Sequence, residues 1–532
     1  MSQSIFNHVL GPVLHGPSSS HTAAAYHIAA LVRSFLGEEP VEAHVAFDEN
    51  GSWGQVYAQQ GSDLAFACGV LGWPIDDGRF FEALETARRQ GVTVAFSVTT
   101  LPGAEHPNDM DVRLRGRNGG ELRCRARSVG GGAVLLTEMD GHPVHLEGDA
   151  HDVVALVPSR ECARAVCAAL ERDGACPGEM VLSDAKEGVH LVVSCRRAPS
   201  PEVRRALEAL LAEERARSGF AESVLRVGTP VFFVPAGEPL FTSAAEAIRL
   251  AEERGCGLGE ISRAYEAQLL GLSEEAVTAE MTRRYRIMRA SVERGLCTEG
   301  DPMRLLDRSA GKVLAAEREG RLPQGGLHTR TAARALAAMH ENSAMGVVVA
   351  APTAGSAGVL PAVAVTLEEE WGLPEEQVVR SLFAASGVGL VVALRATFAA
   401  EVAGCQVEIG AAGAMAAAAV ADAWGGSAQL ACDAAAVAFQ NTMGSICDPV
   451  QGCVEIPCHT RNAVAAASAF VCADLVAGGY VNAIPLDETV DAVYAVGTML
   501  PAELRCTARG GLSLCPSALA LPMRDLRASR RE

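Results

Sequence analysis

The chain has 532 residues, of which 49% are hydrophobic and 20% are charged, which indicates a globular protein of roughly two to four domains. Its formal net charge of −19 argues against nucleic acid or an anionic membrane as a partner, because both would repel an acidic protein. Sixteen cysteines are too dilute in a chain of this length to form a disulfide scaffold.

The sequence also argues against secretion and membrane insertion. The first eight residues lack a basic segment followed by an apolar run, so no signal peptide is visible. A long uncharged apolar stretch at 347–365 is broken by Pro352 and Pro361, which indicates buried packing rather than a membrane span. We therefore expect a cytoplasmic protein in a reducing compartment, with neither membrane nor nucleic acid as a partner.

Residues 1–151 mix strand and helix patterns. The segments 41–47 and 92–98 predict strands, and residues 77–90 predict an amphipathic helix. Near the start, Gly16-Pro-Ser-Ser-Ser-His-Thr precedes an expected helix at 23–36. Its hydroxyl and backbone N–H groups suit a carboxylate, since Gly/Ser turns and helix N-termini bind anions. The alternative is that Ser20 or Thr22 only caps the helix.

Residues 152–234 have the order βαββαβ. Strand patterns at 153–157, 180–183, 189–195 and 223–234 alternate with helix patterns at 160–172 and 201–217. This order is typical of a ferredoxin-like module of the ACT type. Such modules often bind an amino acid, but the Asp-x-Pro-Gly turn common in ligand-binding ACT domains is missing here. A structural or dimerising insert therefore remains the alternative.

Residues 235–532 are predicted to be mostly helical. Segments 242–253, with Ser243 as N-cap, and 274–292 have helix periodicity, and 411–423 predicts a helix of small residues. Charge is sparse between residues 347 and 420. Arg395, Glu401 and Glu408 therefore need partners or a ligand.

Three cysteines in the last quarter of the chain have unusual surroundings. Cys405 lies in Gly-Cys-Gln-Val-Glu-Ile-Gly, whereas Cys447 and Cys458 bracket Cys-Asp-Pro-Val-Gln-Gly-Cys-Val-Glu-Ile-Pro-Cys-His-Thr-Arg-Asn. Any one of them could be an ordinary buried cysteine, and no C-x-x-C pair or ferredoxin run is present. Three thiolates can, however, hold three irons of a [4Fe–4S] cluster and leave the fourth iron open as a Lewis acid.

These two cysteine segments resemble the α domain of the bacterial iron–sulfur L-serine dehydratases. The resemblance implies that Cys405, Cys447 and Cys458 are the three cluster ligands, whereas Cys453 matches none. Further segments resemble the family's β domain and its Pro-Thr-x-Gly-Ser-x-Gly loop: Gly16–Thr22, Gly61-Ser-Asp, His106-Pro-Asn-Asp-Met, Ser128-Val-Gly-Gly-Gly and Ala351–Pro361.

The resemblance covers nearly the whole chain and implies its architecture. We expect a multidomain α+β protein: an N-terminal α/β domain (1–151, β-like), a ferredoxin-like ACT-type module (152–234) and a mostly helical C-terminal catalytic domain (235–532, α-like, cluster-binding). A homodimer is expected as well.

The implied reaction is elimination of water from L-serine to give pyruvate and ammonia. An open cluster iron would assist departure of the hydroxide, and a positioned base would take the Cα proton. His21 and His106 are the candidate bases. Arginine suits a substrate carboxylate, and the full set of candidate substrate-binding residues is Ser18, Ser19, Ser20, Thr22, Asn108, Thr353, Gly355, Ser356, Arg461 and Asn462.

Lysine usage argues against pyridoxal phosphate, the usual cofactor for serine deamination. That cofactor needs a lysine for its Schiff base. The chain has only Lys186, in a polar turn, and Lys312, in a helical stretch without the usual Ser-x-Lys or glycine-loop context. We therefore expect no pyridoxal phosphate.

The chain departs from the family pattern in places. Arg395-Ala-Thr-Phe-Ala-Ala-Glu-Val replaces a common Asn-Ala-x-Ile-Ser-Gly-Ala-Glu, Gln60 replaces a histidine, and His459 replaces an aliphatic residue. Two alternatives therefore stay open: the same elimination on another β-hydroxy or β-substituted amino acid, or a non-catalytic amino-acid or iron–sulfur sensor. The tail resembles the family's as well, so Cys515 is either a fourth cluster ligand or an ordinary cysteine.

Overall fold

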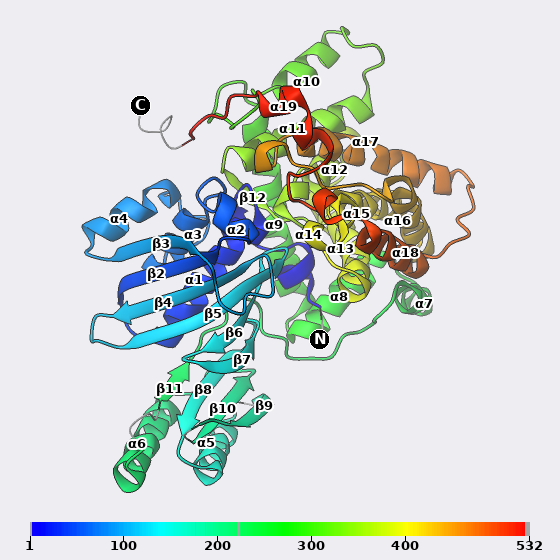
Figure 1. Cartoon of the computed structure of the whole chain (residues 1–532). Coiled ribbons are helices and arrows are strands. Elements are labelled where there is room, and N and C mark those ends of the chain that lie inside the picture. The colour runs from blue at the N-terminus through cyan, green and yellow to red at the C-terminus, as the bar shows by residue number, and fades with distance from the viewer. Residues whose placement is uncertain (1–2, 176, 187, 221–223, 527–532) are drawn as a thin grey trace.

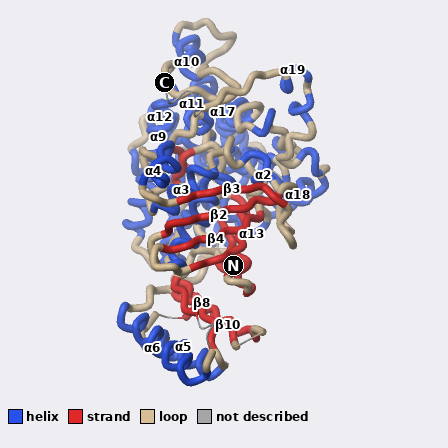
Figure 2. Tube along the Cα trace, turned by 60° about the vertical axis from the view of Figure 1, so that its left-hand side comes forward, coloured by secondary structure: helices blue, strands red, loops and turns tan. Residues whose placement is uncertain are grey.

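The structure, a computed structural model, describes residues 3–526 except 176, 187 and 221–223. It confirms the predicted multidomain α+β class: a sheet-containing N-terminal part, a small α/β module and a large helical part (Figure 1). Most strands lie before residue 230, where they alternate with helices, and the rest of the chain is mostly helical. Figure 2 shows the strands gathered in the lower part of the molecule and helices filling the rest.

The N-terminal part is built on a six-stranded sheet in the order β3-β2-β4-β5-β6-β7. Strands β2 and β3 are parallel, and the other neighbours are antiparallel. Helices α1 and α3 share one buried apolar core with this sheet. The strands and helices are β2 (Pro40–Asp48), β3 (Thr93–Thr99), β4 (Asp109–Gly116), β5 (Glu121–Gly130), β6 (Ala133–Met139), β7 (His142–Leu146), α1 (Ala24–Leu36), α2 (Ser52–Val56), α3 (Ser62–Leu71) and α4 (Ala83–Arg89).

The module that follows has a four-stranded antiparallel sheet in the order β11-β8-β10-β9, with two helices. This strand order and the βαββαβ sequence agree with the predicted ferredoxin-like fold. The module has its own apolar core and projects from one end of the larger sheet (Figure 1). Its elements are β8 (His151–Val157), α5 (Arg160–Arg172), β9 (Pro177–Asp184), β10 (Val189–Cys195), α6 (Pro201–Ser218) and β11 (Val224–Val227).

The helical part is organised around α15 (Ile409–Ala423), which contacts α12, α13, α16 and α17. Alanine and glycine fill α15, and such small side chains allow neighbouring helices to approach closely. The other helices are α7 (Ala244–Arg254), α8 (Leu258–Leu270), α9 (Glu274–Leu296), α10 (Ala310–Arg318), α11 (Leu327–Ser343), α12 (Val359–Trp371), α13 (Glu375–Arg395), α14 (Ala400–Ala403), α16 (Ala428–Thr442), α17 (Cys458–Ala477), α18 (Leu486–Met499) and α19 (Pro516–Leu519).

The first residues of the chain join the two large parts. Residues 5–13 pack in the core of the helical part rather than with the N-terminal sheet. Strand β1 (Val13–His15) then pairs antiparallel with β12 (Val347–Val349). The turn after β1 is therefore held against the loop after β12, and this pairing positions the site described below.

Several local predictions need correction. The helix predicted at 77–90 begins only at Ala83, after a 3₁₀ turn at Phe80–Glu82. The strand predicted to run to residue 234 ends at Val227, because the chain leaves the sheet before Pro230, which cannot donate a ladder hydrogen bond. Neither Ser20 nor Thr22 caps α1, whose N-cap is Ala23. Ser243 does cap α7, as predicted.

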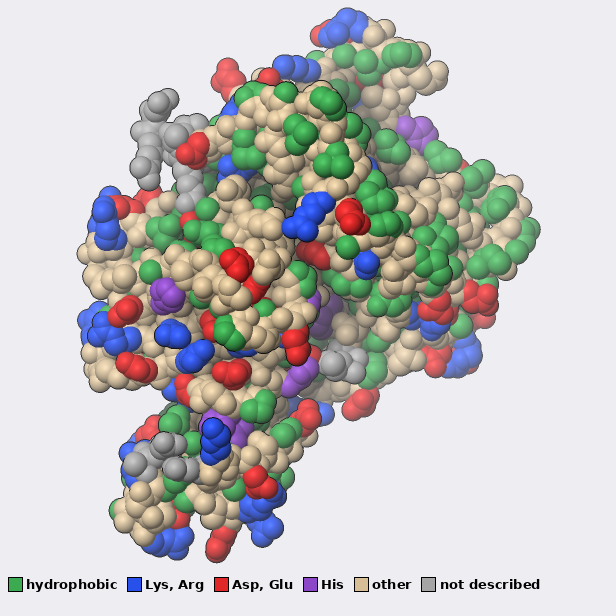
Figure 3. All heavy atoms as spheres, viewed as in Figure 1, with side chains coloured by type: hydrophobic (Ala, Val, Ile, Leu, Met, Phe, Trp, Pro, Cys, Tyr) green, Lys and Arg blue, Asp and Glu red, His purple; other side chains and the backbone are tan. Residues whose placement is uncertain are grey.

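One described helix, α13, is long and apolar enough to cross a membrane, but 78% of its apolar window is buried inside the protein. That burial is typical of the core helix of a folded domain. Exposed apolar side chains gather instead over α17 and the segment after it, on the right of Figure 3. They include Val464, Val471, Leu475, Tyr480 and Val481.

Candidate functional site

The candidate site lies where the N-terminal part meets the helical part. The turn after β1 touches the loop after β12, where the backbone N–H of Ala354 donates to Ser19 Oγ at 3.4 Å. At the far end of β5, a Cβ placed on Gly130 would lie 3.3 Å from Cβ of Ala399, just before α14. Segments distant in sequence are thus brought together on one side of α15.

The three predicted cluster cysteines converge in this region and are almost inaccessible. Cys405 is 2% exposed, Cys447 6% and Cys458 7%. The Cys447 thiol is hydrogen-bonded to the Cys405 thiol, and the charges of Cys405 and Cys458 influence each other. Backbone bonds hold the loops together, since Cys405 N–H donates to Ser445 O at 3.0 Å.

The thiols differ in their ease of ionisation. Hydrogen bonding with Cys447, together with the Arg461 guanidinium, lowers the pKa of Cys405 to about 7 despite its burial. The same thiol pair raises the pKa of Cys447, and burial raises the pKa of Cys458. One thiolate is therefore readily formed beside a fixed positive charge, as a metal-binding cysteine requires.

A fourth cysteine, Cys506, completes the group, and the sequence motifs did not single it out. Its thiol is hydrogen-bonded to that of Cys447, and its N–H donates to Cys447 O at 2.9 Å. It has a left-handed backbone with φ of 61°, which is uncommon for a residue with a side chain. The usable signal was its position in the tail, just before Arg509-Gly-Gly.

Cys515 does not join these thiols. The tail does fold back on the cysteine loop, where Leu512 N–H donates to Asp448 Oδ2 at 2.8 Å. Cys515 itself packs in a separate apolar cluster with Leu305, Val450 and Cys453. The structure therefore places Cys506, rather than Cys515, at the position expected of a fourth thiol.

The donor set consists of thiols, the residue type that holds iron–sulfur clusters. Within the described residues, no three His, Cys, Asp or Glu side chains are arranged to hold one metal ion. A [4Fe–4S] cluster spreads its thiolates over separate irons, so it needs enclosed thiols on several loops rather than a tight single-ion shell. Cys405, Cys447, Cys458 and Cys506 provide such a set.

The predicted Pro-Thr-Ala-Gly-Ser loop forms one wall of the site. Thr353 Oγ1 accepts from Ser356 N–H at 3.3 Å, which closes a tight turn, and Thr353 is also hydrogen-bonded to the Glu408 carboxyl. Gly355 lies so close to Glu408 that a Cβ there would be 1.9 Å from Oε1. The Ser356 hydroxyl forms its hydrogen bonds within the turn, where it donates to Ala351 O and Thr353 O.

Asn462 and Arg461 hold this wall to the cysteines. Asn462 is fully buried, accepts from Gly358 N–H and donates to Gly355 O and Cys458 O, so its amide is occupied by backbone. Arg461 donates to Ile446 O and Asp448 Oδ1, each at 2.8 Å. Its guanidinium thus fixes the loop of Cys447 and provides positive charge beside Cys405.

The N-terminal turn forms the opposite wall. Ser18 Oγ accepts from His21 N–H, and the His21 ring contacts Ser18 Oγ at 3.2 Å and Ser52 Oγ at 3.0 Å. Burial lowers the pKa of His21 to about 4, so its imidazole is neutral near pH 7. Thr22 Oγ1 donates to Gln60 O. Ser20 is half-buried on the same turn.

His106 is engaged in its own turn. Its Nδ1 accepts from Asn108 N–H at 3.1 Å, and desolvation lowers its pKa. Asn108 is buried and joined to β5 through Ser128 N–H. The turn is also linked to α2, since Ser52 N–H donates to Pro107 O at 2.7 Å. The ring of His21 and the turn that follows His106 therefore both contact Ser52, the first residue of α2.

Several buried polar atoms of this wall have no hydrogen-bond partner. They are Trp53 Nε1, Ser62 Oγ, Asn108 Oδ1 and Ser128 Oγ. Buried polar groups are normally paired, so unpaired ones indicate an unseen water or ligand. A cavity of about 340 Å³ lies at the end of β5, lined among others by Gly130, Gly131 and Thr397.

The three charged residues that the sequence singled out between residues 347 and 420 have different surroundings. Arg395 forms an ion pair with Asp491 near the surface. Glu401 and Glu408 lie among the cysteines, where desolvation raises the pKa of both and the Cys405 charge further raises that of Glu408. Both are partly accessible yet enclosed by protein, and the sequence motifs assigned them no role.

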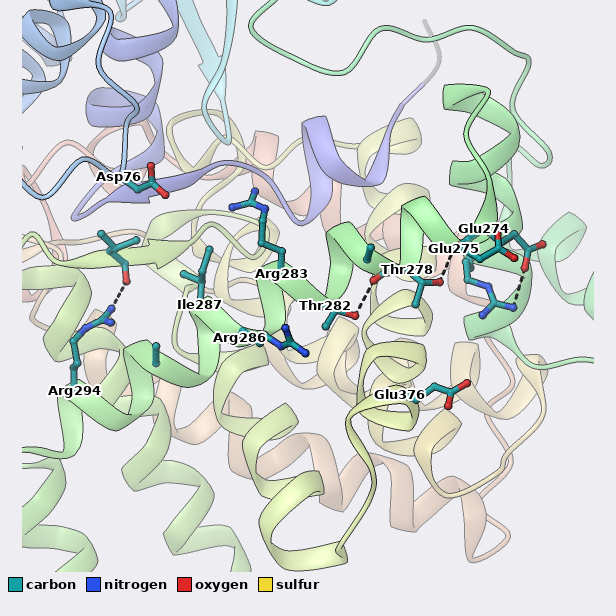
Figure 4. Close-up of a pocket in the computed structure, with 14 residues that line it drawn as sticks. Asp76, Glu274, Glu275, Thr278, Thr282, Arg283, Arg286, Ile287, Arg294 and Glu376 are labelled. Carbon is teal, nitrogen blue, oxygen red and sulfur yellow. Dashed lines mark hydrogen bonds and ion pairs between the residues drawn. The ribbon is translucent and has the colours of Figure 1, made fainter.

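A groove of about 1010 Å³ along α9 is distinct from this site (Figure 4). Its arginines are already paired: Arg263 with Glu274, Arg286 with Glu375, and Arg294 with Glu341. Paired surface charges give little binding energy and no reacting group. The chemistry of the molecule is therefore concentrated at the cysteine site.

Comparison with known proteins agrees with this location. A sequence model of the family described as "Serine dehydratase alpha chain" matches residues 206–513, which include all four converging cysteines. The chain is 36% identical over 282 residues to the "Probable L-serine dehydratase, alpha chain" of Bacillus subtilis, covering 53% of this chain and 94% of that protein.

The chain is also similar to a beta chain. It is 35% identical over 155 residues to the "Probable L-serine dehydratase, beta chain" of Bacillus subtilis, covering 29% of this chain and 68% of that protein. A third relative, the "L-serine dehydratase 2" of Escherichia coli, is 32% identical over 281 residues, covering 52% of this chain and 61% of that protein. One chain thus carries similarity to two separate subunits.

Proposed function

The chain belongs to the serine dehydratase alpha chain family, with alpha-like and beta-like sequence joined in one chain, and from this premise we propose that it is an L-serine ammonia-lyase. It converts L-serine to pyruvate and ammonia. The observation that carries the proposal is the enclosed group of Cys405, Cys447 and Cys458 beside the 353–356 loop. The names of the relatives supply the substrate.

The proposed cofactor is a [4Fe–4S] cluster held by Cys405, Cys447 and Cys458, with Cys506 beside them. When bound, such a cluster with one open iron supplies a Lewis acid for a poor leaving group. Enclosure of the thiols and the low pKa of Cys405 support this assignment. Arg461 offsets the negative charge that the thiolates would gather.

The chain's own residues would bind and orient the substrate between two walls. The Ser18–Thr22 turn offers hydroxyl and N–H groups for a carboxylate, and Thr353 and Gly355 form the facing wall. Asn108 and Ser128 have unpaired polar atoms that a ligand or water would satisfy. Asn462 and Ser356 act through the backbone, because they hold the facing wall in place.

A neutral imidazole is the proposed base for the Cα proton. His21 is favoured over His106, because the turn that carries His21 touches the 353–356 loop through Ser19. Burial keeps His21 neutral near pH 7, as a proton acceptor must be. Ser18 and Ser52 would orient its ring, since each contacts one ring nitrogen.

The departures from the family pattern do not require another substrate. Gln60 donates to Gly452 O at 3.3 Å, and His459 is hydrogen-bonded to Ser343 Oγ at 2.9 Å. Arg395 is turned toward Asp491. The Gln60 amide nitrogen, His459 and Arg395 are thus engaged within the chain, and the choice of L-serine rests on the names of the relatives.

The test is product formation after anaerobic reconstitution with iron and sulfide. A panel of L-serine, D-serine, L-threonine and L-cysteine is supplied, and 2-oxo acid and ammonia are measured. We expect pyruvate and ammonia from L-serine in equal amounts. Turnover of a different amino acid alone would replace the substrate, and a loaded protein that turns over none of them would favour the sensor alternative.

We also propose that the enzyme is a cytoplasmic homodimer. The apolar side chains exposed over α17 are consistent with an interface between copies. Sedimentation velocity of the full chain would measure its mass directly. A single species of 55.4 kDa at micromolar concentration would contradict the dimer.

A further inference from the structure

The Glu408 carboxyl lies beside the 353–356 loop and interacts with the thiols. Thr353 is hydrogen-bonded to its carboxyl, and Gly355 leaves room for it, since a Cβ there would lie 1.9 Å from Oε1. The charges of Cys405 and Cys458 also act on it. The carboxyl is therefore close to Gly355 and near enough to the thiols for their charges to affect it.

The charge around Glu408 is unbalanced. Glu401 adds a second carboxyl, and the thiols add further negative charge once ionised. The nearby cation, Arg461, is already bound to Asp448 and to Ile446 O. Within the described part of the chain, neither Glu401 nor Glu408 forms an ion pair.

Two other enclosed carboxyls among the described residues are held by several donors. Glu266 accepts from Ser4 Oγ and from the N–H groups of Ile5 and Phe6. Glu455 accepts from the N–H groups of three successive residues, 304–306. An enclosed carboxylate without such donors costs free energy, which is why the pKa of Glu408 lies well above its usual range, and a bound cation would favour its charged form.

Glu408 is also reachable. Its residue is partly accessible, although protein surrounds the carboxyl closely enough that desolvation is the main cause of its raised pKa. A small cationic group can therefore reach it, whereas bulk water does not stabilise its charge. The substrate of the proposed reaction brings one such group, the α-ammonium of a zwitterionic amino acid.

We propose that Glu408 receives the α-ammonium group of the substrate and so selects amino acids over the corresponding acids without nitrogen. The inference rests on the proposed function, because it assigns a substrate contact at the same site. The ammonium would donate to the carboxyl while the substrate carboxylate faces the N-terminal turn. A charge-assisted hydrogen bond in an enclosed site is among the stronger polar contacts in proteins.

The test measures binding rather than turnover. Calorimetry on the cluster-loaded full chain compares L-alanine, which has the ammonium and carboxylate, with propanoate, which is alanine without its nitrogen. In the wild type we expect L-alanine to bind at least about tenfold more tightly. In Glu408→Gln the L-alanine affinity should fall by about tenfold or more, while propanoate binds as well as before or better.

Matched variants separate recognition from folding. Glu266→Gln removes a different enclosed carboxyl, far from the thiols, and should leave the preference for L-alanine unchanged. Glu408→Asp keeps the charge and should retain part of the preference. Iron content and circular dichroism are measured for every variant. If Glu408→Gln fails to fold, the wild-type preference and the Glu408→Asp value still decide the matter.

The outcomes distinguish the inference from the function. Equal loss of both ligands in Glu408→Gln, or no loss of either, would overturn the role of Glu408, and so would a wild type without preference for L-alanine. Pyruvate from L-serine together with any of these results would leave the proposed function standing. A Glu408-dependent preference without turnover would instead remove the proposed function and keep the ammonium site.

Discussion

Two carboxyl groups in the helical part show how differently the fold treats buried charge. Glu266, completely buried, is surrounded by donors from the Ser4–Phe6 turn and ties the start of the chain to α8. Glu408 has the hydroxyl of Thr353 and otherwise faces thiols and a second carboxyl. The first arrangement stabilises the fold, whereas the second leaves binding capacity for something outside the chain.

The cysteines divide in the same way. Cys432 is buried in α16, and burial raises its pKa, as expected of a thiol used for packing. Cys405 is equally buried, yet its neighbours lower its pKa to about 7. The difference lies in Cys447 and Arg461, which stabilise the thiolate. Burial alone therefore does not separate structural from functional residues, but the partners do.

The largest expected effect is loss of the cofactor. Cys405→Ala, Cys447→Ala and Cys458→Ala should each abolish both bound iron and pyruvate formation, because each removes a ligand. Iron, sulfide and turnover are measured after anaerobic reconstitution. Cys432→Ala is the control and should keep both. Full iron content in any of the three variants would remove that cysteine from the ligand set.

Gly355→Ala should impair turnover while the cluster stays bound. An added methyl meets little besides Glu408 Oε1, so it displaces that carboxyl. We expect kcat/KM for L-serine to fall by about ten- to a hundredfold, the effect of losing one charge-assisted contact. Unchanged kinetics at full iron content would mean that the position of Glu408 is unimportant.

The free energy of unfolding should respond differently to replacement of Glu266 and of Glu408. Glu266→Gln replaces an acceptor by an amide whose NH₂ faces donors, so the free energy of unfolding should fall by about 2 kcal/mol in urea titrations. Glu408→Gln should change it by less than about 1 kcal/mol or raise it, since the neutral amide costs less to enclose than an unpaired carboxylate. A larger loss of unfolding free energy in Glu408→Gln than in Glu266→Gln would contradict the difference between the two carboxyls.

A smaller effect concerns pH. Burial lowers the pKa of His27 to about 4, so below pH 6.5 the unfolded chain takes up a proton that the folded chain does not. This residue's contribution to stability is therefore present above pH 6.5 and is lost as the pH falls toward 4. His27→Gln should reduce the loss of unfolding free energy between pH 7 and pH 5 by about 2 kcal/mol. An equal loss of unfolding free energy between pH 7 and pH 5 in the wild type and in His27→Gln would contradict the lowered pKa of His27.

The fold could be predicted where it depends on local pattern. The ferredoxin-like module followed from alternating strand and helix periods, and the N-cap at Ser243 from its side chain. The packing of residues 5–13 in the helical core could not be predicted, because the β1–β12 pairing joins segments more than 300 residues apart. Sequence periodicity contains no information about such a partner.

The site was predictable in its motifs and not in its contacts. The segments around Cys405, Cys447 and Cys458 identified thiols that the fold does bring together. Cys506 was missed because nothing in its local sequence indicates that the tail lies parallel to Cys447. Glu408 was recognised only as a charge in need of a partner, since the lack of one becomes visible only in three dimensions.

The most direct test of the central claim is Mössbauer spectroscopy of the full chain reconstituted with ⁵⁷Fe. We expect a four-iron cluster in which the signal of one iron changes when L-serine is added and the signals of the other three do not, because Cys405, Cys447 and Cys458 would each hold one iron. A cluster with no iron that responds to L-serine, or iron bound without any four-iron cluster, would contradict it.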